Sequence, residues 1–113
     1  MRRSEILQRL EAHRDELVGM GVKSLAIFGS AARDDARAES DVDILVEFTG
    51  PATFNGYMDL KFFLEDLLGR PVDLVTRRSI RPGLKVRIES EARYVQGLQA
   101  LIIGASTFGP LAG

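Results

Sequence analysis

Three aspartates carry the clearest chemical signal in this sequence: Asp41, Asp43 and Asp73. Asp41 and Asp43 are two residues apart at the start of an apolar run. In a β-strand this spacing places both side chains on one face, with Cα atoms roughly 6.6 Å apart. Neighbouring carboxylates raise each other's pKa unless a cation lies between them. Because the ligands are oxygen atoms, the pair favours Mg²⁺ or Mn²⁺ over Zn²⁺, although an isolated Asp-x-Asp is more often simply solvated.

Asp73 stands between Val72 and Leu74 in a later apolar run, where a carboxylate needs a partner. If its strand neighbours the strand that follows Asp41, all three acids meet on one face of a sheet. Two metal ions held ~3.5–4 Å apart by carboxylates form a clamp for in-line phosphoryl or nucleotidyl transfer. The three aspartates therefore form the candidate catalytic and metal-binding set.

A turn at Gly29 and Ser30 supplies a candidate phosphate site. Glycine allows the backbone to approach a ligand closely. Ser30 and the amides after it, at the start of a predicted short helix, could receive phosphate oxygens. Arg33 would project from the first turn toward a phosphate. The alternatives are that Ser30 only caps the helix and that Arg33 is a solvated surface residue.

The elements that must position these residues follow from apolar periodicity. We predict helices over 4–18 with Ser4 as N-cap, over 54–68, and from Pro82 to about residue 94. Strands are predicted over 24–28, 42–48 and 72–75, and a charged loop over 34–40. The helix over 54–68 has a second apolar stripe that contains Phe54 and Phe62. That stripe either packs under the N-terminal helix or is offered to another protein.

This alternation of helices and strands predicts an α/β (α+β) fold, a small mixed β-sheet flanked by helices. The link from Gly29 to Asp41 is too short for a helical crossover, so the strands it joins should be antiparallel. We place the domain at residues 1–95. Residues 96–113 form a C-terminal tail without charged residues.

Composition narrows the classes of function. The chain has 113 residues, a net charge of -1 and no cysteine. This charge gives no broad electrostatic attraction for nucleic acid or an anionic membrane, so neither is predicted as a direct partner. No apolar run reaches the ~18 residues of a membrane span, and no signal core follows the N-terminus. We expect a cytoplasmic protein.

The residues together resemble a known superfamily. Phe28-Gly29-Ser30 followed by Asp41-Val42-Asp43 and a later strand aspartate is similar to the signature of the polymerase-beta-like nucleotidyltransferases. The fuller stretch from Gly29 to Val46, with 72–75 and 87–92, resembles the minimal (MNT) branch. The resemblance covers about residues 5–95.

This resemblance implies the polymerase-beta-like fold and transfer of AMP from ATP to a hydroxyl, with two Mg²⁺ ions per site. Asp41 and Asp43 would hold the metals. Asp73 would assist one metal and activate the hydroxyl, and Gly29 with Ser30 would hold the triphosphate. Many MNT proteins are antitoxins that adenylylate a tyrosine of a HEPN-type ribonuclease toxin.

The chain is too short to include an acceptor-binding domain, so the acceptor site must come from a partner or a second subunit in a homo- or hetero-oligomer. The resemblance implies that this partner is a HEPN-type toxin. Two alternatives are a non-catalytic antitoxin-type binding module and a small-molecule nucleotidyltransferase.

Overall fold

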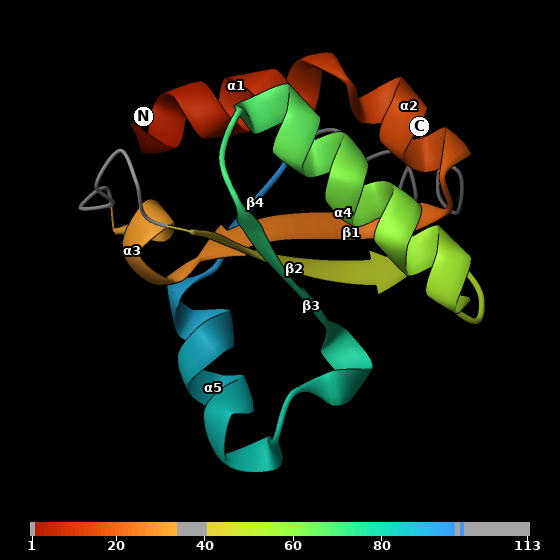
Figure 1. The fold of residues 1–113 in the computed structure, drawn as a ribbon. Coiled ribbons are helices and arrows are strands. Elements are labelled where there is room, and N and C mark those ends of the chain that lie inside the picture. The colour runs from red at the N-terminus through yellow and green to blue at the C-terminus, as the bar shows by residue number, and fades with distance from the viewer. Residues whose placement is uncertain (1, 34–40, 97, 99–113) are drawn as a thin grey trace, which may run out of the picture.

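A computed structural model describes residues 2–33, 41–96 and 98, which fold around a four-stranded sheet of order β3-β2-β1-β4 (Figure 1). In chain order the elements are α1 (Arg3–Ala12), α2 (Arg14–Gly19), β1 (Val22–Phe28), α3 (Gly29–Ala32), β2 (Val42–Phe48), α4 (Phe54–Leu68), β3 (Val72–Thr76), the 3-10 helix η1 (Arg77–Ser79), α5 (Pro82–Glu91) and β4 (Arg93–Tyr94). The predicted charged loop over 34–40 lies outside the described residues.

The sheet is mixed, which confirms the predicted fold class. β1 and β2 are antiparallel, as the short link between them requires, and β2 and β3 are parallel. β4 differs from the prediction, which places its two residues at the end of the last helix. That helix ends at Glu91, and the chain then pairs with β1, where the Val95 N–H donates to the Leu25 carbonyl at 2.8 Å.

The N-terminal helix differs from the prediction. It is broken at His13 into α1 and α2, and Ser4 lies inside α1 instead of capping it. The His13 N–H reaches back only to Leu10, and its ring nitrogen Nδ1 lies 2.9 Å from the Arg9 carbonyl oxygen. This side-chain contact takes up a carbonyl of the preceding turn and accompanies the change in direction of the chain.

The hydrophobic core lies between one face of the sheet and the helices α1, α2 and α4. α4 has the predicted bounds; the Thr53 hydroxyl accepts a hydrogen bond from the Gly56 N–H, and Gly69 ends the helix at φ 66°. On the second stripe of α4, Phe54 and Phe62 are 77% and 57% exposed. Those two aromatic side chains are therefore not packed under the N-terminal helix.

The opposite face of the sheet carries far less cover. α5 begins at Pro82, as predicted, and stands beside this open face (Figure 1), but none of its residues is buried. No helix within the described ranges is long and apolar enough to cross a bilayer. Most of the predicted tail lies outside the described residues, although Leu98 is buried in the core.

Candidate active site

The site begins where β1 passes into α3 at Gly29. This residue has a φ of 66°, a left-handed conformation that favours glycine. A Cβ atom at this position would lie 2.3 Å from Oδ2 of Asp43. Gly29 therefore makes room for the Asp43 carboxylate, a role that the Gly-Ser turn alone did not indicate.

The parallel pairing of β2 with β3 brings two of the predicted acids together. Asp43 and Asp73 are direct partners in the register, so their side chains emerge side by side on the open face. Asp41 precedes β2 and is exposed, as is Asp73, whereas Asp43 is half-buried. The strand adjacency that the sequence left conditional is present in the structure.

Burial and like charge act together on Asp43. Loss of hydration, followed by the charges of Asp73 and Asp41, raises the pKa of Asp43 from 3.8 to about 6, against the opposing effect of Arg33. The ionised carboxylate is thus destabilised at neutral pH in the absence of a cation. A bound cation would relieve this repulsion directly.

A divalent metal fits this donor set, because hard carboxylate oxygens suit Mg²⁺. Asp43, whose pKa is raised, would be stabilised most by a nearby positive charge. Across residues 2–33, 41–96 and 98, no group of three or more His, Asp or Glu side chains is arranged to hold a metal ion. The charges of Asp73 and Asp41 act on Asp43, but the three carboxylates do not converge as a metal-binding group in the described residues.

The predicted phosphate-binding residues lie at the same edge of the sheet. Ser30 is part of α3, and its side chain lies outside what the structure describes. Arg33 is exposed and forms an ion pair with Glu91 of α5 at 3.3 Å. The positive charge of Arg33 also acts to lower the pKa of Asp43. Arg33 therefore interacts both with the acidic site and with α5.

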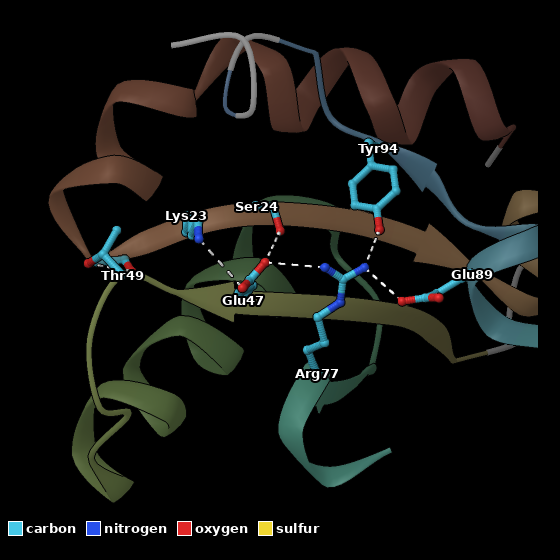
Figure 2. A network of polar contacts seen from close by, with 8 residues as sticks. Lys23, Ser24, Glu47, Thr49, Arg77, Glu89 and Tyr94 are labelled. Atoms are coloured by element: carbon cyan, nitrogen blue, oxygen red, sulfur yellow. Dashed lines mark hydrogen bonds and ion pairs between the residues drawn. The ribbon is translucent and has the colours of Figure 1, made fainter. Parts of the chain in front are cut away.

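Sequence reasoning missed a polar network further along the open face, centred on Arg77 (Figure 2). Its guanidinium contacts Glu47 at 3.4 Å, Glu89 at 2.9 Å and the Tyr94 hydroxyl at 3.0 Å. Glu47 also contacts Lys23 and Ser24. The sequence contains a usable signal. Glu47 falls on the same face of β2 as Asp43, and Arg77 follows β3 at the same even spacing from Asp73.

A mixed sheet with an Asp-x-Asp pair beside a third strand aspartate, close to a glycine turn, defines a polymerase-beta-like nucleotidyltransferase. The nucleotidyltransferase domain family matches residues 5–95, and the chain belongs to that family, in its minimal branch. It is accordingly an enzyme of the nucleotidyltransferase class.

Two well-covered relatives support this assignment. The protein adenylyltransferase MntA of Thermococcus cleftensis is 40% identical over 92 residues, which are 80% of this chain and 93% of that protein. A solved structure provisionally described as a minimal nucleotidyltransferase is 36% identical, with a TM-score of 0.72 over 82% of this chain and 95% of that one.

Two more distant solved structures share the fold. One is a toxin–antitoxin complex with AMP-PNP, 21% identical with a TM-score of 0.63, covering 94% of this chain and 87% of that one. The other is a tri-AMPylated HEPN toxin of Shewanella oneidensis with its MNT antitoxin, 18% identical with a TM-score of 0.53, covering 84% of each chain.

Replacing Gly29 by alanine should disable the site without unfolding the protein. The new Cβ would collide with the Asp43 carboxylate, and the left-handed backbone would cost about 1–2 kcal/mol. We expect nucleotidyl transfer to fall at least about a hundredfold, since a displacement of about 1 Å can have that effect. Circular dichroism and transfer rates check this. The control is Gly19→Ala, where a Cβ meets nothing within 4 Å; equal rates for the two variants would contradict the account.

The raised pKa of Asp43 predicts how metal-free stability depends on pH. A carboxyl that binds its proton more tightly in the folded state stabilises the protein at low pH and loses this contribution as pH rises from about 4 through about 6. In EDTA, Asp43→Asn should therefore unfold at higher urea than wild type at pH 7.5, by about 1 kcal/mol after allowance for solvent screening.

The difference between Asp43→Asn and wild type should shrink toward zero near pH 4. The matched control for the loss of one carboxylate is Asp59→Asn, at an exposed position on α4. A constant difference between Asp43→Asn and wild type from pH 4 to 7.5 would rule out the raised pKa of Asp43.

Proposed function

We propose that this protein transfers AMP from ATP to a tyrosine hydroxyl of a HEPN-type toxin, in a Mg²⁺-dependent reaction, and acts as the antitoxin of the pair. The observation that carries the proposal is the side-by-side placement of Asp43 and Asp73, with the pKa of Asp43 raised and its carboxylate fitted against Gly29. An acidic site of this kind suits cation-assisted chemistry on a triphosphate.

Asp41, Asp43 and Asp73 would hold two Mg²⁺ ions. When bound, these ions would neutralise the phosphate charge and stabilise the attacking and leaving oxygens. The shared open face and the raised pKa of Asp43 support this assignment, since each added positive charge offsets the mutual repulsion of the carboxylates.

The proposed reaction transfers AMP from ATP to the acceptor hydroxyl. The acceptor oxygen forms a bond to the α-phosphorus of ATP, the bond from that phosphorus to the bridging oxygen breaks, and pyrophosphate leaves. Asp73, which is exposed at the start of β3, accepts the proton of the acceptor hydroxyl. The backbone at Gly29 and Ser30 would hold the triphosphate, and Arg33 would contribute positive charge near it.

Two observations support a protein acceptor. The described residues form a single sheet with its helices and include no second domain that could bind an acceptor. A relative 40% identical is named a protein adenylyltransferase, and a distant structure with the same fold contains an AMPylated HEPN toxin.

The test uses α-labelled ATP, Mg²⁺ and the protein encoded beside this chain's gene. Wild type should label the partner on tyrosine, and Asp41→Ala/Asp43→Ala should reduce the rate at least about a thousandfold. Asp59→Ala, which removes an exposed acid from α4, is the matched control and should keep the wild-type rate.

Absence of label with wild type, or equal labelling by the double variant, would overturn the proposal. If the double variant still protects cells that express the partner, a non-catalytic binding module is the better account. Labelling of an aminoglycoside without any protein partner would instead indicate a small-molecule nucleotidyltransferase.

A further inference from the structure

We propose that a groove at the far end of β2 and β3 binds an acidic segment of the acceptor protein, an inference that rests on the proposed function of adenylylating a protein. The groove is separate from the aspartates. It lies where both strands end, between the loop into α4, the 3-10 helix η1 and the start of α5.

Two adjoining cavities of about 630 and 370 Å³ make up this groove. They share four lining residues: Pro51, Ala52, Thr76 and Arg78. The larger cavity extends to Pro82 and Lys85 at the start of α5, and the smaller extends to Phe54 on α4. A volume of this size is typical of ligand sites, and its length from α5 to α4 suits a chain segment.

The charge of the groove favours an acidic ligand. Its larger cavity is lined by Arg77, Arg78 and Lys85, against a single acid, Glu47. Glu47 and Arg77 already contact each other and their neighbours in the polar network of Figure 2. Arg78 and Lys85 are exposed, and no side-chain ion pair or hydrogen bond engages them within the described ranges. In a chain of net charge -1, this is a local concentration of positive charge.

The groove also has apolar walls that suit a side chain next to the acidic residues. Phe48 and Ile80 are half-buried along the larger cavity, and Phe54 is 77% exposed beside the smaller one. An aromatic side chain exposed to this degree gains most when a partner covers it. Together with the two cations, these walls fit an acidic segment that also carries apolar residues.

The distance from groove to site is within reach of a short segment. Thr76 lines both cavities and stands three residues after Asp73 on the same strand. At 3.2–3.4 Å per residue this is about 10 Å. An acceptor segment seated in the groove thus spans the gap with about three extended residues and presents its tyrosine to the carboxylates.

The probe for this groove is a fluorescein-labelled copolymer of glutamate and tyrosine, with a lysine–tyrosine copolymer as the charge control. Anisotropy titrations at low salt would compare wild type with Arg78→Glu and Lys85→Glu. We expect each reversal to raise the Kd about tenfold or more, since like charges across an interface are strongly disfavoured. Arg14→Glu, an exposed reversal on α2, should change the Kd by less than about twofold, and ATP affinity should be unchanged in all four proteins.

The proposal that the groove binds an acidic segment would be wrong in any of three cases. These are no binding of the glutamate–tyrosine copolymer, equal binding by all variants, or equally tight binding of the lysine copolymer. Displacement of the copolymer by ATP or inorganic phosphate would also overturn it, because the groove would then be an anion or nucleotide site. If wild type binds the copolymer but labels no partner, the proposed function is contradicted, whereas the proposed binding of an acidic segment in the groove is still supported.

Discussion

The constraint on which this structure depends is the placement of two carboxylates at one register position of a parallel strand pair. Asp43 and Asp73 lie side by side because β2 and β3 run in the same direction in this register. A Cβ atom at Gly29 would collide with the Asp43 carboxylate in its present position, and the left-handed backbone at Gly29 also disfavours a side chain. Burial of Asp43, followed by the charges of Asp73 and Asp41, raises the pKa of Asp43 to about 6 in this arrangement.

Elsewhere on the open face, charged side chains form ion pairs with one another. α5 has no buried residue, and Glu89 and Glu91 connect it to Arg77 and Arg33. Partly exposed ion pairs of this kind contribute little stability each, so the core on the other face holds the fold together. On the open face the side chains of Asp41 and Asp73 are exposed, whereas Ala26 and Leu45 further along the sheet are buried.

Much of this could be predicted from the sequence, because the signals are local. Strand alternation predicts the shared face of the aspartates, the short link predicts that β1 and β2 are antiparallel, and apolar periodicity predicts the bounds of α4. The misses depend on contacts between distant segments. β4 is two residues long and exists through its pairing with β1, and the Arg77 network joins residues up to 30 positions apart. The break at His13 coincides with a side-chain contact to the Arg9 carbonyl oxygen, which periodicity does not reveal.

The most direct measurement of the central claim is paramagnetic broadening of amide NMR signals by Mn²⁺ in the metal-free protein. We expect broadening to begin at the amides of Asp43 and Asp73, which carry the carboxylate pair, and of Gly29 beside Asp43. Asp43→Asn should weaken the Mn²⁺ broadening, because this substitution removes the carboxylate whose pKa is raised. Broadening centred elsewhere, or identical broadening in wild type and Asp43→Asn, would contradict the claim that this carboxylate pair is the cation site.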